Sequence, residues 1–305
     1  MKTNNKAKRL GIVLSGSGPV IDLLAAKIRA RPDLRLASSP VAESDAVVPA
    51  GTDCIVHVPT GKALVDGSAA AQIVAWLRAG NNVVSTVPME ALAGTDVLAA
   101  CREGRSCFHG TGGYQTRLVS RFNRAFASIA RNIRDVELIE ERDVAELPTD
   151  DARASEGFYA AGLHTLADAV FCDAMPDVAV SSKASHRDGC DVLSSRIGKC
   201  GDPVEQLVVR RSLGEHLAYD THFRRREPGD APRAGSSLRY RLNTQSSDAI
   251  GHVTIEIHAG DGVDPADQLA CGGLLDAIRP VCESRPGILR HELGINQVML
   301  NACLA

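Results

Sequence analysis

The chain has no long apolar run and few aromatic residues, and these shortages exclude several classes of protein. Aromatic residues make up 4% of its 305 residues, and no stretch interleaves them with basic residues as base stacking requires. The formal net charge of −3 gives no long-range field that would attract nucleic acid. No run approaches the roughly 18 apolar residues of a membrane helix, and the longest candidate for a secretory signal core, Leu10–Leu14, is too short. We therefore expect a cytoplasmic protein with no nucleic-acid or membrane partner.

The nine cysteines form no metal or redox motif. They are odd in number and scattered, with no Cys-x-x-Cys pair and no histidine at the spacing of a zinc ligand. Several of them, including Cys54, Cys107 and Cys271, stand in apolar segments where cysteine behaves as a small hydrophobic residue. We expect reduced, structural thiols and no metal site.

The chain has the composition of a globular protein, with 44% apolar and 23% charged residues. Its length favours two domains. In the first third, short β-branched runs alternate with segments of helical period, which predicts a parallel sheet with crossover helices. The expected strands are Leu10–Leu14, Leu34–Ala37, Cys54–Val58, Asn82–Thr86 and Ser106–His109, and the expected helices are Pro19–Ala30, Ala69–Ala79 and Thr95–Arg102.

After Thr116 the regular alternation gives way to longer segments, which indicates a second domain. Helices are predicted at Leu118–Ile133 and Gly157–Met175, separated by a strand at Val136–Glu141 and a polar link at Pro148–Glu156. Further strands are predicted at Val178–Ser181, Gln206–Arg210, Ser237–Thr244 and Gly251–His258, with a loop at 222–235 and a last helix at Pro265–Val281 that ends before "SRPGI".

The predicted fold class is α/β, with a Rossmann-like doubly wound parallel sheet and a second α+β domain built on an open mixed or antiparallel sheet. Residues 1–112 form the first domain, which the C-terminal segment 265–305 completes. Residues 113–264 form the second domain, for which substrate binding and dimerisation are expected.

A glycine-rich turn, "LSGSGPVIDLL", follows the first predicted strand. In a dinucleotide-binding turn, G-x-G-x-x-G, the first glycine allows the tight turn, the second lets the backbone approach the pyrophosphate, and the third lets helix and strand pack closely. Gly16 and Gly18 supply the first two, whereas Ile21 occupies the third position and Pro19 removes one N–H donor. A βα turn that binds no ligand is the alternative interpretation.

The adenosine side of such a site is shortened in this sequence. The second strand is followed by "LASSPVAESD", where Ser38 and Ser39 could accept a phosphate weakly and no Arg or Lys is near. About fifteen residues separate this strand from the next at Cys54, too few for a helix and a strand with their turns.

Four segments together resemble the dihydrodipicolinate-reductase-like group, which includes 2,4-diaminopentanoate dehydrogenase and the native amine dehydrogenases. These segments are "DCIVHVPTGKA", "LRAGNNVVSTVPME", "CREGRSCFHGTG" and "LLDAIRPVCESRPGILRHELGI". The resemblance covers most of residues 8–145 and 265–296. It implies a Rossmann domain, a second domain that carries a homodimer interface, and NADPH or NADH as the cofactor for reactions at a C–N bond.

The resemblance also implies roles for particular residues. The pyrophosphate would face Gly16, Ser17, Gly18, Pro19 and Val20, the nicotinamide ribose would face Pro59 and Thr60 after Val58, and the nicotinamide would face Ser85, Thr86 and Pro88. Glu90 would lie near the reacting nitrogen, where a carboxylate can handle the ammonium proton and stabilise an iminium. The alternative for Glu90 is an acid favoured by the dipole at a helix N-terminus.

The turn after the fifth strand departs from the family, in which it tends to read G-T-G-x-N-P-G. Here Gly110-Thr111-Gly112-Gly113 is followed by Tyr114 and Gln115, and the loop faces substrate in the family. Thr111, Tyr114, Gln115 and Arg117 therefore suggest a different ligand, with the tyrosine as a donor and the arginine as an anchor for a carboxylate or phosphate. A solvated helix start is the alternative interpretation.

Two histidines are further candidates. His109 ends a strand at the carboxyl edge, where open α/β sheets bind ligands, and it could manage a proton as Glu90 or Tyr114 could. His164 lies in the apolar segment "YAAGLHTLADAV" and either points toward substrate or is a satisfied core histidine.

Two hypotheses for the function follow. In the first, the chain is an NAD(P)H-dependent oxidoreductase that acts on an amine, imine or related carbonyl group of a small molecule, in specialised metabolism. In the second, the fold persists without nucleotide binding and the chain is a cofactor-independent cyclase or isomerase.

Overall fold

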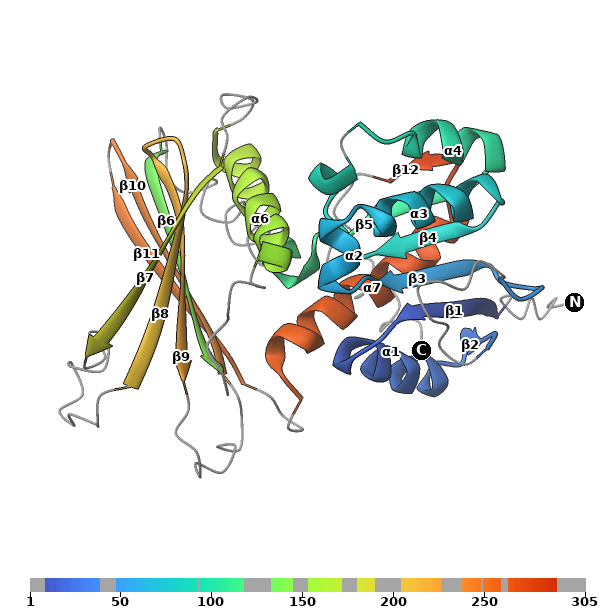
Figure 1. Ribbon diagram of the computed structural model, residues 1–305, viewed down its shortest axis with the longest axis horizontal. Coiled ribbons are helices and arrows are strands. Elements are labelled where there is room, and N and C mark those ends of the chain that lie inside the picture. The colour runs from blue at the N-terminus through green and yellow to red at the C-terminus, as the bar shows by residue number, and fades with distance from the viewer. Residues whose placement is uncertain are drawn as a thin grey trace, which may run out of the picture. The chain divides into compact units, whose positions relative to one another are not determined.

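Short strands and helices alternate along the first third of the chain, as the apolar spacing predicts. The computed structural model describes residues 9–38, 48–92, 94–117, 133–144, 153–171, 180–189, 204–225, 237–247, 249–258 and 263–289. The chain divides into two units, the first comprising Met1–Tyr114 and Asp267–Ala305 and the second Gln115–Ala266. The first unit contains, in chain order, β1 (Leu10–Gly16), α1 (Pro19–Ala30), β2 (Leu34–Leu36), β3 (Cys54–Val58), α2 (Gly61–Val65), α3 (Ser68–Arg78), β4 (Asn82–Ser85), the 3-10 helix η1 (Met89–Leu92), α4 (Val97–Gly104), β5 (Cys107–Gly110), most of α7 (Pro265–Glu283) and β12 (Gly287–Ile288) (Figure 1).

The strands of this unit form a six-stranded sheet in the order β12-β5-β4-β3-β1-β2, and all its neighbouring pairs are parallel. The chain runs outward from β1 to β2 and then returns to the other side of β1 with β3. This reversal of direction is the switch point at which doubly wound sheets bind ligands. β12 comes from the C-terminal part of the chain and pairs with β5 at the far edge.

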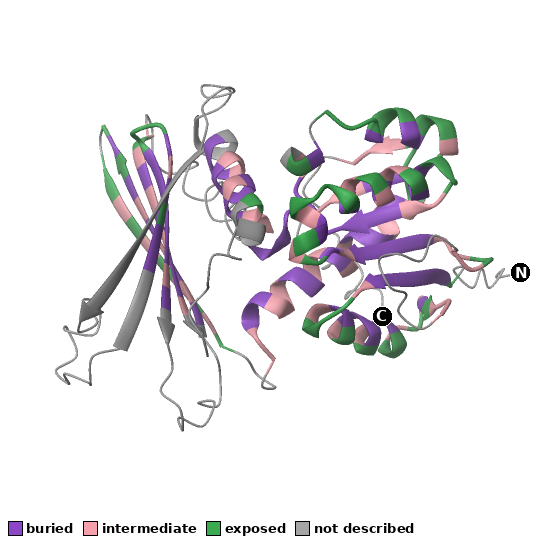
Figure 2. Ribbon diagram, viewed as in Figure 1, coloured by how far each residue is buried: buried purple, intermediate pink, exposed green. Residues whose placement is uncertain are grey.

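Helices cover both faces of the sheet, so its central strands are buried (Figure 2). One apolar cluster joins one face to residues of α1 and α7, namely Ile21, Leu24, Ile28, Leu274, Ile278 and Val281. The other face packs against α3 and α4 through Ile73, Trp76, Leu77, Val97 and Ala100. In each helix the buried residues recur at three or four positions, the period of a single helical face.

The Rossmann-like fold class is confirmed, and α1 and β3 have the predicted bounds. Three elements of the first unit, α2, η1 and β12, were not predicted. α2 is only five residues long, which is too short to show a helical period. β12 has only two residues, and its partner strand β5 lies some 180 residues earlier in the chain. The segment "SRPGI" therefore ends α7 and also begins a strand.

The second unit is built on a six-stranded mixed sheet. Its elements are β6 (Ile133–Val144), α6 (Arg153–Phe171), β7 (Val180–Gly189), β8 (Val204–Leu213), β9 (Leu217–Arg225), β10 (Ser237–Ser246) and β11 (Ile250–His258), and the sheet order is β11-β10-β6-β9-β8-β7. Among the described strands of this second sheet, β6 and β9 are the only parallel pair, and the other neighbouring pairs are antiparallel. The open mixed sheet predicted for this domain is therefore confirmed.

One face of this sheet packs against α6 and buries charged side chains. Glu140 is 0% exposed and Arg211 is 1% exposed. Tyr219 donates a hydrogen bond to Oε2 of Glu140, and the hydroxyl of Tyr159 donates to Oε1 at 3.5 Å. The guanidinium of Arg211 lies 3.9 Å above the ring of Tyr159 and donates to Oγ1 of Thr221 at 3.0 Å. These contacts offset the loss of hydration that buried charges suffer.

Several predicted boundaries in the second unit are wrong. The polar link Pro148–Glu156 is wrong from Arg153 onward, because α6 begins there. Ala154 and Glu156 are good helix formers, so the polarity of this stretch does not distinguish a link from a helical turn. The helix predicted at Leu118–Ile133 lies outside the described residues except for Ile133, which begins β6.

No strand was predicted at β9, and the predicted loop at 222–235 is wrong for residues 222–225, which belong to this strand. The arginines there resemble a solvated loop in sequence, but their backbone pairs with β6, where Arg224 is opposite Asp143 and Arg225 is opposite Val144. None of the helices in the described part of the chain combines the length and hydropathy that a membrane span requires.

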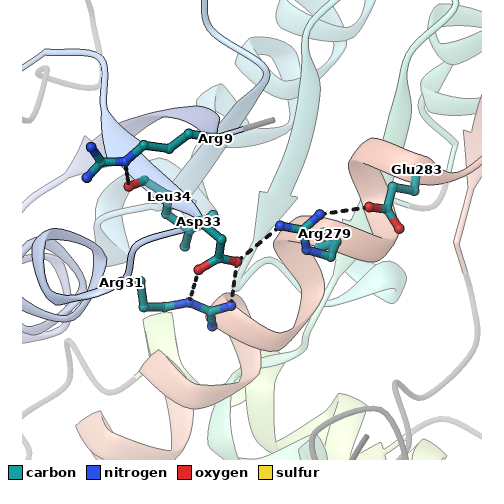
Figure 3. A network of polar contacts seen from close by, with 6 residues as sticks. All are labelled: Arg9, Arg31, Asp33, Leu34, Arg279 and Glu283. Carbon is teal, nitrogen blue, oxygen red and sulfur yellow. Dashed lines mark hydrogen bonds and ion pairs between the residues drawn. The ribbon is translucent and has the colours of Figure 1, made fainter. Parts of the chain in front are cut away.

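An ion-pair network ties α7 to the turn between α1 and β2 (Figure 3). Arg31 holds both carboxylate oxygens of Asp33, at 3.0 and 2.9 Å. Arg279 of α7 donates to the same carboxylate at 3.2 Å and to Glu283 at 2.9 Å. Because Asp33 and Arg279 are far apart in sequence, this network attaches α7 to the first βαβ unit.

Asp33→Asn is expected to lower the free energy of unfolding at pH 7 by about 1 kcal/mol. The hydrogen bonds from Arg31, and then those from Arg279, hold the pKa of Asp33 at about 2, below the usual 3.8. Since the folded-state pKa is the lower one, the carboxylate stabilises the fold above about pH 4, and this contribution is lost as the pH falls toward 2. The Arg31 and Arg279 side chains are 38% and 30% exposed, so solvent screening reduces the effect.

Urea unfolding of the two proteins at pH 7 and near pH 2 measures this difference. Glu283→Gln is the matched control, because Glu283 binds the same arginine from a 62% exposed position, and its effect should stay within about 0.5 kcal/mol. A stability difference for Asp33→Asn that is as large at pH 2 as at pH 7 would contradict the assignment.

Candidate functional site

The carboxyl ends of four neighbouring strands are aligned at one edge of the parallel sheet. Gly16 at the end of β1 is opposite Val58 at the end of β3, and Ser85 at the end of β4 is opposite both His57 and Gly110. The segments that follow these strands therefore leave the sheet at the same edge. They contain the predicted cofactor residues and, after β5, Thr111 and Tyr114.

The glycine-rich turn between β1 and α1 is open. Gly16 has φ +122°, and a Cβ atom there would lie 2.1 Å from the carbonyl oxygen of Val58, so only glycine lets the two strands pair at this point. Gly18 has φ +97° and is the N-cap of α1, with its carbonyl accepting the amides of Ile21 and Asp22 at 3.0 and 3.2 Å. A Cβ atom on Gly18 would meet nothing within 4 Å.

Ile21, the bulky residue in the third glycine position, points into the core and not into the turn. Its side chain is 2% exposed and belongs to the apolar cluster beneath α1. Ser17, Gly18 and Pro19 are exposed, and Val20 is half-buried. The isoleucine is therefore accommodated by the packing of helix on sheet, and it does not crowd Gly18, where an added Cβ atom would meet nothing within 4 Å.

The segment after β3 supplies a helix cap. Pro59 is buried and Thr60 is exposed. Oγ1 of Thr60 accepts the amide of Ala63 at 3.3 Å and caps α2, as threonine commonly does at this position. A contact between these two residues and a nicotinamide ribose stays a prediction.

The last residue of β4, Ser85, is buried, and so are Thr86 and Pro88 in the segment that follows it. The hydroxyl of Ser85 is fully enclosed, because it accepts the amide of Val87 at 3.2 Å and lies 3.2 Å from Nδ1 of His57. Any contact of Ser85 with a cofactor would consequently use its backbone. Nearby, Glu90 belongs to η1, but its side chain lies outside the described part of the structure, so its predicted role is not tested.

His57 is a site residue that the sequence analysis missed. It is 0% exposed, and its ring meets the ring of Trp76 edge to face, with centroids 5.1 Å apart. Burial lowers the pKa of His57 to about 4, so the imidazole is neutral at pH 7. In sequence it is a single histidine in an apolar strand, and only its register beside Ser85 distinguishes it.

His109 is half-buried at the end of β5, with Nδ1 2.8 Å from the carbonyl oxygen of Leu289. Burial lowers the pKa of His109, and the hydrogen bond to this carbonyl opposes that shift. A carbonyl can only accept, so Nδ1 carries the proton in the neutral ring and Nε2 is the acceptor. His109 therefore has the tautomer of a proton acceptor.

The turn after β5 is anchored on β4, since the amide of Thr111 donates to the carbonyl of Ser85 at 2.8 Å. Oγ1 of Thr111 is buried and has no hydrogen-bond partner among the residues described. Tyr114 and Gln115 are 8% and 5% exposed, within a helical segment at 113–117, so the interpretation of a solvated helix start is wrong for both. Arg117 is half-buried in the same segment.

The predicted substrate residues fall in two units. Thr111 and Tyr114 belong to the first, whereas Gln115, Arg117 and His164 belong to the second. His164 is half-buried in α6. Substrate contacts for all five stay predictions.

Several solved dehydrogenases have a fold similar to that of this chain. No family model and no curated protein sequence matches the chain. An amine dehydrogenase from Mycobacterium smegmatis has a similar structure, with a TM-score of 0.55 and 15% identity over 94% of this chain and 98% of that one. GenD2 from gentamicin A biosynthesis, solved in complex with NAD, has a TM-score of 0.55 and 12% identity over 94% of this chain and 89% of that one.

A putative myo-inositol dehydrogenase from Sinorhizobium meliloti 1021 is also similar, with a TM-score of 0.51 and 15% identity over 91% of this chain and 92% of that one. At these identities the likeness is one of fold. The resemblance to the group that includes the native amine dehydrogenases is confirmed at that level.

Proposed function

We propose that this chain is an NAD(P)H-dependent oxidoreductase that acts on the C–N bond of an amine or imine, or on a related carbonyl group, of a small molecule of specialised metabolism. The observation that carries the proposal is the open glycine-rich turn at the switch point of the sheet. The carbonyl of Val58 leaves no room for a side chain at Gly16, and nothing within 4 Å crowds the position of Gly18. Backbone amides at the start of a helix next to such a turn suit a diphosphate.

The described residues fit a nicotinamide dinucleotide. The backbone from Gly16 to Val20 would hold the diphosphate, Pro59 and Thr60 the nicotinamide ribose, and the segment from Ser85 to Pro88 the nicotinamide. When bound, the reduced cofactor supplies a hydride to the carbon of a C=N or C=O group. The fold likeness to an amine dehydrogenase supports a nitrogen-containing substrate.

Side chains of the protein would donate and accept the protons that the reaction requires. Condensation of ammonia with a ketone forms the C=N bond and releases water, and reduction then adds a hydride to carbon and a proton to nitrogen. His109 is suited to accept a proton because its Nε2 is the unprotonated nitrogen, and Glu90 is our candidate for the carboxylate near the nitrogen. Tyr114 could donate to a polar group of the substrate, with Arg117 as an anchor for an anionic one.

Consumption of NADH or NADPH with a panel of ketones, with and without ammonia, tests this proposal. Ammonia-dependent consumption is the expected result, with the amine as the product. Consumption without ammonia would support the broader oxidoreductase and overturn the C–N substrate. No consumption, together with no binding of either nucleotide, would favour the alternative of a cofactor-independent cyclase or isomerase.

The observation that supports this alternative is the short β2 segment, at the edge of the sheet where the adenosine of a dinucleotide would bind. β2 has only three residues and is the last described strand at its edge. The described residues that follow it, Ala37 and Ser38, include no acidic or basic side chain that would grip an adenosine ribose or its phosphate.

Glu90→Gln is expected to abolish turnover while changing the melting temperature little. The amide keeps the size of the carboxylate but cannot take up a proton, so catalysis should fall by about 10²-fold or more. Steady-state rates and thermal unfolding of the same preparation measure the two effects. An unchanged rate would remove Glu90 from the reaction and leave His109 as the candidate.

We also propose that the protein is a homodimer formed through the second unit. The sheet face opposite α6 carries crossing ion pairs, such as Arg239 with Glu141 and Glu256 at 3.1 Å each. A sheet face that carries charges of both signs can contact the same face of a second copy across a two-fold axis. Light scattering of the purified chain gives the mass in solution directly.

A further inference from the structure

Three polar side chains lie side by side beneath the carboxyl edge of the parallel sheet. Ser15 of β1 is opposite His57 of β3, and His57 is opposite Ser85 of β4. Residues in register on neighbouring strands share a face of the sheet. That face is the one covered by α3, because His57 contacts Trp76. All three side chains of this row are 0% exposed.

A chain of hydrogen bonds runs from this row into the turn after β4. The amide of Val87 donates to Oγ of Ser85 at 3.2 Å, and Oγ lies 3.2 Å from Nδ1 of His57. Because the hydroxyl accepts the amide proton, its own proton is available to the neutral imidazole. Backbone bonds reinforce the same turn, since the amide of Thr86 donates to the carbonyl of His57 at 3.1 Å.

Ser15 provides an internal contrast to Ser85. It lies on the other side of the same histidine and is equally buried, yet its hydroxyl makes no hydrogen bond within the described residues. A buried hydroxyl without partners contributes little to its neighbours, whereas one that satisfies a buried amide is expensive to remove. The two serines therefore separate the effect of the hydrogen-bond chain from the effect of deleting a buried hydroxyl.

We propose that Ser85 and His57 are positioning residues that fix the turn 86–88 in the conformation that receives the nicotinamide end of the cofactor. The inference rests on the proposed function. Ser85 acts through the backbone amide of Val87, a buried residue, and His57 acts through Ser85. Without the Ser85 hydroxyl, the Val87 amide and Nδ1 of His57 would both lack this partner in a dry environment, so the turn would relax to find others. The diphosphate turn at Gly18 follows β1, which β3 separates from β4 in the sheet, so it would be unaffected.

The experiment compares Ser85→Ala with Ser15→Ala by titration with NADH, NADPH and ADP-ribose, which lacks nicotinamide. In Ser85→Ala we expect the Kd of whichever reduced nucleotide the wild type binds to rise about tenfold, which corresponds to about 1.4 kcal/mol. The Kd of ADP-ribose should stay unchanged in both variants, and Ser15→Ala should bind both ligands as the wild type does. A purely structural defect would weaken both ligands together.

Amide hydrogen exchange without ligand provides a readout that does not depend on the proposed function. Exchange at Val87 should be about tenfold faster in Ser85→Ala and unchanged in Ser15→Ala. If Ser85→Ala does not fold, His57→Leu removes the imidazole partner of the Ser85 hydroxyl while keeping apolar volume, and it should show the same selective loss of the reduced nucleotide.

Two results would overturn the inference, namely equal weakening of ADP-ribose and the reduced nucleotide, or unchanged exchange at Val87 in Ser85→Ala. A wild-type chain that binds none of the three nucleotides contradicts the proposed function and, with it, the nicotinamide role of the turn. In that case faster exchange at Val87 would still identify the hydrogen-bond chain as the element that holds the turn, so the two failures are distinguishable.

Discussion

Gly16→Ala is expected to lower the free energy of unfolding by about 4 kcal/mol, and Gly18→Ala by about 2 kcal/mol. At Gly16 the added Cβ atom would lie 2.1 Å from the carbonyl oxygen of Val58, which belongs to the backbone of the paired strand and cannot move without separating β1 from β3. The positive φ of +122° adds strain. At Gly18 only the strain of φ +97° applies, because no atom lies within 4 Å of the added methyl group.

Chemical denaturation of the two variants measures these costs. Gly18→Ala serves as the control for backbone strain, since it has a similar φ but no steric conflict. Equal destabilisation of the two variants would show that β1 and β3 do not approach as closely as described. A folded Gly18→Ala protein is also the right material for testing nucleotide binding, because its methyl group would enter the space that we assign to the diphosphate.

Glu140→Ala is expected to lower the free energy of unfolding by about 3–5 kcal/mol. The substitution leaves the hydroxyls of Tyr219 and Tyr159 without their acceptor and removes a negative charge from a region that also contains the fully buried Arg211. Removing one partner from a buried polar cluster leaves the other polar groups without a hydrogen-bond partner or water. The expected loss of stability is therefore larger than for an ordinary surface ion pair.

Glu137→Ala is the matched control on the same strand. Glu137 faces the other side of the sheet, has a 37% exposed side chain and pairs with Arg210 at 3.5 Å and Asn243 at 3.0 Å. Exposed pairs of this kind contribute little, so its substitution should change the free energy of unfolding by less than about 1 kcal/mol. Similar losses for the two variants would mean that the buried cluster contributes no more than a surface pair.

The fold of the first unit could be predicted because each of its elements has its own signal in the sequence. A β-branched run at Cys54–Val58 and an apolar period in Pro19–Ala30 mark a buried strand and a crossover helix without reference to the rest of the chain. β12 had no such signal, because its two residues become a strand only through pairing with β5. In the second unit, the arginines that end β9 resembled a loop for the same reason.

The candidate site could be predicted only where it depends on the backbone. The spacing of Gly16 and Gly18 predicts a tight turn from the sequence alone. The structure explains why Ile21 is tolerated, because its side chain is buried beneath α1. His57 and Ser85 could not be recognised as a pair, since 28 residues separate them and only the register of β3 and β4 brings Nδ1 to within 3.2 Å of the hydroxyl. The sequence pattern gave no sign that Glu140 would be enclosed on the helix-covered face, because a single strand does not reveal which of its two faces is buried.

Titration of the wild-type chain and of Gly18→Ala with NADH and NADPH tests most directly whether the turn from Gly16 to Val20 holds a diphosphate. We expect the wild type to bind at least one of the two nucleotides and to melt at a higher temperature in its presence, by about 2.7 kcal/mol of added stability at a hundredfold excess over Kd. Gly18→Ala should remain folded and lose this stabilisation. If millimolar nucleotide leaves the melting temperature of the wild type unchanged, the turn does not bind a dinucleotide and the chain has no hydride donor.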